Sequence, residues 1–311
     1  MYSSLLIIMS REVKSQIYYY ARKGWYQHVV SLCDQVMSKK GKDPTLLFWK
    51  GLGIGMLHGF YEAKSFLEIL KGRRDFLLPV STLLLHFAKR SESPDEEFIY
   101  ASESEIMVAE ESAKDITLVL TARVCLLLDA SMKSFSFCER ILKQCSDLPS
   151  TPVEWEAKSI HTWSLVKECN NTREQRSDTM SQLQEVYNYF ETQQDALLLD
   201  PDLLILQSEI KLILNMTCDD IIATYDVIVA NYPTFSSILG LKAILLATEN
   251  SWDHALEAAQ IALDEDKYNI DAMMVIAVHA FTHESQSDDA IRKFEDLRLT
   301  IVDNESKSIQ L

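Results

Sequence analysis

Two stretches of this sequence combine residue types and spacings that could support chemistry, and the first is rich in glycine. Residues 49–59 read WKGLGIGMLHG and hold four of the chain's eight glycines. Such glycines can form a phosphate-binding loop, but that loop follows a strand and ends in Lys followed by Ser or Thr. Here FYEAKSF follows Gly59, so no such pair stands directly after the last glycine. A helix that lets a neighbour come close is the alternative reading.

The second stretch, HAFTHE, places His279 and His283 four residues apart, which is one face of a helix. A pair like this holds zinc in metalloproteases when Glu directly follows the first His and serves as general base. Ala280 stands at that position instead. We expect ordinary surface or groove histidines, no metal and no cofactor. Because the sequence also lacks a nucleophile-elbow signature, we expect no enzyme and no small-molecule substrate.

The cysteines do not suggest a metal site or a disulfide framework. They form no C-x-x-C pair and fall mostly inside apolar periodic segments. We expect reduced thiols, buried in the core of a cytoplasmic protein. The six positions are Cys33, Cys125, Cys138, Cys145, Cys169 and Cys218.

Charge is distributed unevenly along the chain. Residues 1–90 contain 14 Lys and Arg against 6 Asp and Glu, whereas residues 91–311 contain 16 against 40. A surface this acidic repels phosphates, which argues against a nucleic-acid partner. The basic residues form two clusters, Lys39, Lys40 and Lys42, and Lys71, Arg73 and Arg74. These clusters could meet an acidic protein or an anionic membrane, although solvated charge is commoner.

Length and hydropathy indicate a protein that is not embedded in a membrane. With 311 residues, 47% of them hydrophobic, the chain can bury a sizeable core. No apolar run reaches the about 18 residues that a bilayer span needs. The short apolar run at residues 5–9 has no cationic residue before it, so we expect no secretory signal.

The elements that must position these residues are helices. Strand-type alternation does not persist anywhere, and amphipathic segments of helical period are separated by short polar breaks. Residues 202–235 and 236–269 align without a gap over 34 residues each. A helix, turn and helix every 34 residues is the tetratricopeptide repeat period. We therefore predict an all-α fold, a tetratricopeptide-repeat α-solenoid built as a right-handed superhelix of antiparallel helix pairs.

The same frame divides the whole chain. We expect one solenoid over residues 10–303, between an N-terminal tail (1–9) and a C-terminal tail (304–311). The clear repeats are 10–43, 44–77, 202–235, 236–269 and 270–303, and divergent helical pairs fill 78–200. Pro44, Pro201 and Pro233 stand where one pair ends and the next begins, because proline restricts the residue before it.

This frame answers the question that the glycines raise. A hairpin of close-packed helices needs a small residue at the eighth place of its first helix and another at the start of its second. Gly51 and Ala243 fill the first place, and Ala63 and Ala255 fill the second. We predict that Gly51, Gly53 and Gly55 lie inside a helix, with Gly59 in the following turn.

In a solenoid, the first helix of each pair lines a concave surface that usually binds the partner. We predict that the outward-facing places on these helices form a groove for an apolar helix or extended segment, although plain core is the competing interpretation. These residues are Tyr18, Phe48, Leu52, Met56, Leu206, Ile210, Ile213, Met274, Val278 and Phe281. A groove that grips a C-terminal carboxylate needs clustered cations, and the helices from residue 202 onward offer only Lys211 and Lys242.

The order of several motifs resembles one family. The segments IYYYARKGWYQHVVSLCDQ, ANYPTFSSILGLKAILLA and ENSWDHALEAAQIALDEDKYNIDAMMVIAVHAF resemble the N-terminal region of the tetratricopeptide repeat protein 21 family, the large repeat subunit of the intraflagellar transport A complex. The likeness covers roughly residues 11–300. It implies a non-enzymatic scaffold in the cytoplasm and cilium, bound to other transport A subunits, that acts in return transport from the ciliary tip and in cargo entry. Members of this family are several times longer than this chain.

Two other functions stay open from the residues alone. The repeats by themselves also fit a general cytosolic adaptor or co-chaperone that binds a short peptide. An enzyme would depend on His279 and His283, and absence of bound zinc would remove its only support.

Overall fold

A computed structural model describes residues 10–143, 151–171, 176–283 and 288–304. All regular secondary structure in these residues is α-helical, which confirms the predicted all-α class. Contacts divide the described chain into two compact units: unit 1 comprises residues 10–13 and 17–183, and unit 2 comprises residues 14–16 and 184–304. The single solenoid over 10–303 therefore stays a prediction. The expected tails lie outside the described residues, except that Asn304 ends the last helix.

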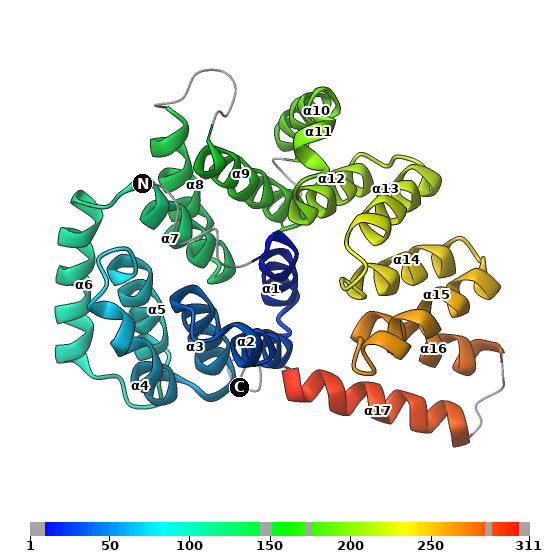
Figure 1. The fold of residues 1–311 in the computed structure, drawn as a ribbon, viewed down its shortest axis with the longest axis horizontal. Helices are drawn as coiled ribbons and strands as arrows, with labels where there is room; N and C mark the ends of the chain where they lie inside the picture. The colour runs from blue at the N-terminus through cyan, green and yellow to red at the C-terminus, as the bar shows by residue number, and fades with distance from the viewer. Residues whose placement is uncertain (1–9, 144–150, 172–175, 284–287, 305–311) are drawn as a thin grey trace. The chain divides into compact units, whose positions relative to one another are not determined.

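Unit 1 is built from consecutive helices that stack as pairs (Figure 1). Each of α3, α5 and α7 packs against the helix that follows it and also against the next odd-numbered helix, which is the contact pattern of a solenoid. Its helices are α1 (Arg11–Lys23), α2 (Tyr26–Lys40), α3 (Pro44–His58), α4 (Phe60–Lys71), α5 (Leu77–Lys89), α6 (Glu96–Glu111), α7 (Asp115–Leu127), α8 (Ser131–Leu142) and α9 (Pro152–Asn171).

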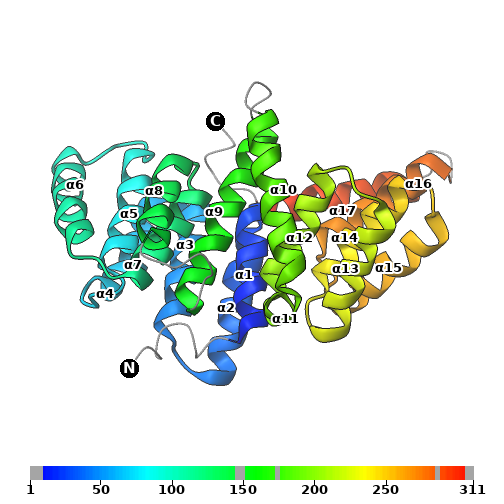
Figure 2. The same ribbon diagram turned by 90° about the horizontal axis from the view of Figure 1, so that it is seen from above.

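Unit 2 repeats this pattern. Helices α12 to α17 pack in succession, and α14 also contacts α16 (Figures 1 and 2). The buried cluster between α14, α15 and α16 consists of six alanines and Val275, and larger apolar side chains such as Leu239 and Trp252 pack around it. We call this cluster the alanine core. The helices are α10 (Arg176–Thr192), which begins in unit 1, α11 (Gln194–Leu197), α12 (Pro201–Ile213), α13 (Cys218–Asn231), α14 (Ser237–Thr248), α15 (Trp252–Glu265), α16 (Ile270–His283) and α17 (Asp288–Asn304).

Four hairpins share one turn. Gly24, Asp129, Asn215 and Asn250 each have a left-handed backbone, with φ of 76°, 60°, 54° and 59°. In each hairpin the next residue donates its backbone N–H to a carbonyl five residues back, as Trp25 does to Tyr20. This is how a helix ends when Gly, Asn or Asp can adopt the left-handed conformation. The turn at Asp129 shows that α7 and α8, in the divergent part, form the same kind of hairpin.

An ion pair also recurs at equivalent places of the frame. Lys50 Nζ lies 2.6 Å from Asp34 Oδ1, and Lys242 Nζ lies 2.5 Å from Asp226 Oδ1. In both cases the second helix of one repeat supplies the Asp and the first helix of the next supplies the Lys. Half-exposed pairs of this kind contribute little stability, about 0–1 kcal/mol. Their recurrence shows that residues 10–77 and residues 202–269 follow the same repeat frame.

Helix starts follow from the sequence around the prolines. Pro44 and Pro201 are the first residues of α3 and α12, as predicted. Asp43 and Asp200 precede them and cap the helices, because their carboxylates accept backbone N–H groups that lack a partner within the helix. Pro233 lies in the connection between α13 and α14.

The glycines of α3 are packing residues. A Cβ at Gly51 would lie 2.3 Å from Cδ2 of Leu67, and a Cβ at Gly55 would lie 2.2 Å from Cε2 of Phe87. A Cβ at Gly53 would lie 2.8 Å from Cγ2 of Val30. Three neighbouring helices therefore press directly on the α3 backbone, which confirms the prediction of a helix that admits close neighbours.

Candidate protein-binding surfaces

The ten predicted groove residues fall into buried, half-buried and exposed groups. Five of the ten are buried: Tyr18, Phe48, Leu52, Leu206 and Ile210. The prediction that these side chains face an open groove is wrong, because neighbouring structure covers that part of their helices. Phe48, for example, has its ring 5.8 Å from the ring of Phe76. Of the ten, Met274 and Phe281 are exposed, and Met56, Ile213 and Val278 are half-buried.

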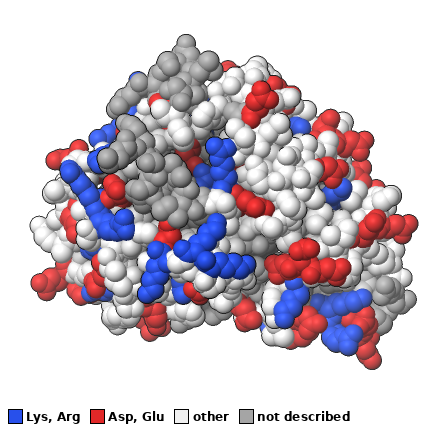
Figure 3. Space-filling view, in the orientation of Figure 1, with Lys and Arg blue, Asp and Glu red and all other residues white. Residues whose placement is uncertain are grey.

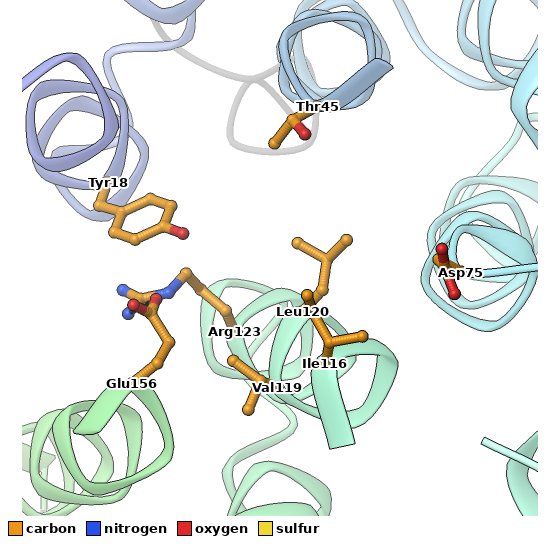
Figure 4. Close-up of a pocket in the computed structure, with 8 residues that line it drawn as sticks. All are labelled: Tyr18, Thr45, Asp75, Ile116, Val119, Leu120, Arg123 and Glu156. Atoms are coloured by element: carbon orange, nitrogen blue, oxygen red, sulfur yellow. Dashed lines mark hydrogen bonds and ion pairs between the residues drawn. The ribbon is translucent and has the colours of Figure 1, made fainter. Parts of the chain in front are cut away.

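Tyr18 nevertheless borders a hollow within unit 1 (Figure 4). The hollow has about 30 Å³ of space for water, room for about two molecules. Its lining is mostly apolar, with Ile116, Val119 and Leu120 of α7 forming one wall. Thr45 of α3 lies across from them, and Asp75 lies further to one side.

One end of the hollow carries a buried ion pair. Nη2 of Arg123 lies 2.5 Å from Oε1 of Glu156, and these residues are only 3% and 7% exposed. The guanidinium also stacks on the ring of Tyr18, with Cζ 3.6 Å from the ring centroid. Burial makes the removal of either partner costly, while the aromatic face gives the cation a second favourable contact. Together these contacts link helices α1, α7 and α9.

Sequence reasoning missed Arg123 and Glu156. The available signal was the position of Arg123 within DITLVLTARVCLL, where every other residue after Asp115 is apolar or carries a hydroxyl. A charge on such a helix must find a buried partner. The sequence does not indicate which carboxylate supplies it, because Glu156 lies on a different hairpin.

In unit 2 the predicted groove residues of α16 form one apolar ridge, whereas the half-buried Ile213 lies on α12. Met274, Val278 and Phe281 recur at helical spacing on a single face. The ring of Phe281 packs edge to face against Phe294 of α17, with centroids 5.7 Å apart, although both rings are partly exposed. We call Met274, Val278, Phe281 and Phe294 the α16–α17 ridge. It provides an apolar surface on which a partner side chain or helix could pack.

The paired histidines of α16 lie close to this ridge and pack against aromatic rings. The rings of His279 and His283 stack 4.6 Å apart with planes inclined by 10°, and Trp252 packs against both. Among the described residues, no three His, Cys, Asp or Glu side chains gather closely enough to hold a metal ion. The observed role of the pair is aromatic packing between α15 and α16.

Four of the five described cysteines are buried, as predicted, and Cys218 is not. Cys33, Cys125, Cys138 and Cys169 are free and buried, and Cys218 is half-buried. Burial raises the pKa of the Cys33 and Cys138 thiols to about 12 and that of Cys125 to about 11. Such thiols carry almost no thiolate near neutral pH and are poor nucleophiles. Cys145 lies outside the described residues.

Basic and acidic side chains are distributed unevenly over the surface, as they are along the sequence. Of the predicted basic clusters, all members except the half-buried Lys71 are exposed. On the face shown in Figure 3, Lys and Arg side chains gather over the area of α1 and α2, and acidic side chains are frequent over α13 to α15. Within the described residues, no helix combines the length and apolar character that crossing a bilayer requires.

A family model and several known proteins that resemble this chain all belong to one family. A family model described as the tetratricopeptide repeat protein 21 N-terminal ARM repeat matches residues 17–256. Tetratricopeptide repeat protein 21B of Xenopus laevis is 25% identical over 286 residues, which cover 92% of this chain and 20% of that protein. Tetratricopeptide repeat protein 21B of Mus musculus is 23% identical over 303 residues, covering 97% and 22% respectively.

A second type of relative extends the comparison. Tetratricopeptide repeat protein 21A of Mus musculus is 24% identical over 298 residues, which cover 91% of this chain and 20% of that protein. The chain thus spans about a fifth of the length of these curated relatives. Its stacked helical hairpins agree with the repeat architecture named by the matching model. The chain belongs to the tetratricopeptide repeat protein 21 family, in which it corresponds to the N-terminal repeat region.

Proposed function

We propose that this chain is a non-catalytic scaffold that binds other proteins. The observation that carries the proposal is the family match over residues 17–256, together with the stacked hairpins that the structure describes there. Solenoids of this kind present extended surfaces to partners instead of a reaction centre.

We infer more specifically that the chain acts as a subunit of the intraflagellar transport A complex, in retrograde ciliary transport and in the entry of ciliary cargo. Its partners are then other subunits of that complex, and its location is the cytoplasm and the cilium. The motif order at the start of the chain and around Trp252 supports this assignment, as does membership of the family.

The α16–α17 ridge supports a contact surface for such a partner in unit 2. It is apolar, partly exposed, and contains three of the residues that the repeat frame places on the binding face: Met274, Val278 and Phe281. Aromatic and Met side chains are the types that contribute most at protein interfaces. The half-buried Met56 and Ile213 remain further candidates for groove contacts.

A carboxylate-gripping co-chaperone is less well supported. The two lysines available to it are already engaged: Lys211 Nζ donates to Thr224 Oγ1 at 2.9 Å, and Lys242 pairs with Asp226 at 2.5 Å. A carboxylate clamp needs cations that are free to bind the ligand.

Affinity purification of the tagged full chain from ciliated cells tests the proposal. We expect transport A subunits in the eluate, and we expect Phe281→Asp to reduce their recovery because it places a charge in the ridge. Ile261→Asp on α15 is the matched control, since Ile261 is similarly exposed, at 46% against 47% for Phe281. Recovery of chaperones without any transport subunit would favour the adaptor function instead.

A further inference from the structure

Helix α6 has one face that is packed and one that is not. On the packed face, Ile99, Ser102 and Ala109 are buried. The ring of Phe98 lies 5.0 Å from Phe60 of α4, and Glu105 binds Lys71 at 2.8 Å. These contacts fix α6 against α4 and α5 and leave the opposite side of the helix outward.

The outward side is unusually apolar for an exposed helix. Tyr100, Met107 and Val108 are 75%, 71% and 70% exposed. Their spacing of seven and eight residues brings them onto neighbouring positions of one stripe, which lies opposite the buried stripe. We call Tyr100, Met107 and Val108 the α6 stripe. Large apolar side chains this exposed, gathered on one helix face, mark an interaction site.

The charge around the α6 stripe has a single sign. Helix α6 contains six glutamates and neither Lys nor Arg. Glu103 and Glu105 pair with Lys89 and Lys71. Within the described part of the chain, the other four glutamates of the helix form no ion pair: Glu96, Glu97, Glu110 and Glu111. The stripe is therefore bordered by carboxylates whose charge a partner can still neutralise.

We propose that the outer face of α6 docks a basic amphipathic helix of a partner protein. Its apolar residues would pack on Tyr100 and Met107, and its Lys or Arg side chains would reach the flanking glutamates, as complementary helices do in paired assemblies. This surface is separate from the hollow and from the α16–α17 ridge, and its role does not depend on which complex the chain joins.

Other occupants fit this chemistry less well. A second copy of the chain would bring α6 against α6 and place glutamates opposite glutamates, which is repulsive. Nucleic acid and anionic membranes carry the same sign of charge as the helix and are repelled. A basic helix satisfies both the apolar stripe and its acidic border.

Binding of two synthetic peptides to the full chain tests the proposal. The first is a fluorescent amphipathic helix of Leu and Lys, about four turns long, and the second has Glu in place of every Lys. We expect the Lys peptide to bind and the Glu peptide not to bind. Tyr100→Ser combined with Met107→Ser is expected to weaken Lys-peptide binding about tenfold or more, because two central apolar contacts are lost.

Matched variants separate this site from general attraction to an acidic protein. Ile69→Ser on α4 removes an apolar residue that is 77% exposed and lies outside the stripe, and it is expected to leave binding unchanged. Glu97→Gln with Glu111→Gln is expected to weaken binding about threefold and to reduce its salt dependence. Equal binding by the Tyr100→Ser, Met107→Ser variant would overturn the proposal, as would binding of the Glu peptide.

A readout on the unaltered protein guards against variants that fail to fold. A photoreactive group in the middle of the Lys peptide is expected to cross-link within residues 96–111, as read by mass spectrometry of the digested product. Cross-links confined to other helices would also overturn the proposal.

Discussion

Helix α3 of unit 1 and helix α14 of unit 2 occupy equivalent places in their repeats but admit their neighbours differently. In α3 the helix provides bare glycines, and the neighbours provide large side chains, Leu67 and Phe87. At Ala243 of α14 both sides are small, because this residue lies in a cluster with alanines of α15 and α16. Close approach of two helices therefore does not require small residues on both of them.

The comparison explains why three glycines are tolerated within one helix. Each costs about 1 kcal/mol relative to alanine in an unpacked helix. In α3 the space that a Cβ would fill is occupied by buried side chains, so the cost is offset by the packing of Leu67 and Phe87 against the backbone. The glycine-rich helix α3 is thus closely packed against its neighbours.

The largest expected effect concerns the buried ion pair of Arg123 and Glu156 in unit 1. The alanine core of unit 2 has no equivalent pair, because its members are all apolar. Arg123→Ala leaves the carboxylate of Glu156 buried without its cation, and we expect a loss of about 3–5 kcal/mol in the free energy of unfolding. Urea denaturation followed by circular dichroism measures this. The double variant Arg123→Met, Glu156→Leu is the control, because an apolar pair of similar size should restore most of the stability.

Tryptophan fluorescence assigns such losses to one unit. Trp252 is the single tryptophan of unit 2, whereas Trp25, Trp49, Trp155 and Trp163 belong to unit 1. In a Trp252→Phe background the fluorescence change therefore reports unit 1 alone. If Arg123→Ala reduced the free energy of unfolding but left the unfolding transition seen by unit 1 fluorescence unchanged, the structural role assigned to the ion pair would be contradicted.

The next largest change in stability is expected from substitution of a glycine in α3. We expect Gly55→Ala to reduce the free energy of unfolding by about 1–3 kcal/mol, because the added Cβ would overlap the buried ring of Phe87 and the gain in helix propensity does not cover that cost. Gly72→Ala is the matched control, since no atom lies within 4 Å of its Cβ position. It should be neutral or slightly stabilising in the same urea titration.

A double-mutant cycle sharpens this prediction. Leu67→Ala removes the atoms that a Cβ at Gly51 would meet, so Gly51→Ala should cost less in that background than in the natural protein. Purely additive effects would mean that Leu67 does not determine the need for glycine at position 51.

A smaller effect is expected from pH through His86 of α5. Burial, aided by Arg90, lowers the pKa of His86 from 6.5 to about 4. Between these values the unfolded chain binds the proton and the folded chain does not, so stability is fully present above about pH 6.5 and falls as the pH decreases towards 4. Because solvent screens charges at this half-buried site, we expect the free energy of unfolding to fall by about 1–2 kcal/mol over this pH range.

Comparison with His86→Gln isolates that contribution. The variant should lose less stability than the natural protein when unfolding by urea is repeated at about pH 7 and about pH 4.5. Identical pH dependence of the two proteins would show that His86 is not responsible.

The smallest change in stability is expected from a substitution in the alanine core of unit 2. Ala259→Gly should cost about 1 kcal/mol, chiefly through the conformational freedom that glycine regains on unfolding. Fluorescence of Trp252, measured in a protein whose other tryptophans are replaced by Phe, follows unit 2. If Ala259→Gly, on α15, cost more than Gly55→Ala, the alanine core of unit 2 would not be the more tolerant of the two helix contacts.

Sequence reasoning succeeded where a feature depends on residues close together in the chain. Pro44 and Pro201 start their helices as predicted, and Gly51 to Gly55 lie inside one. It failed for Phe48, Leu52, Leu206 and Ile210, which have the spacing of a binding face but are buried. Periodicity identifies which face a residue is on, and cannot say whether a later part of the chain covers that face.

The sequence by itself determined the helices, their caps, the hairpin turns and the register of the repeats, because backbone propensity, capping and small-residue spacing act over a few turns of helix. Only the tertiary structure decided the rest. It brought Tyr18, Arg123 and Glu156 together from three hairpins and left Tyr100 and Met107 uncovered. These outcomes depend on which helices stack against which, and burial between distant segments is a property of the packed chain as a whole.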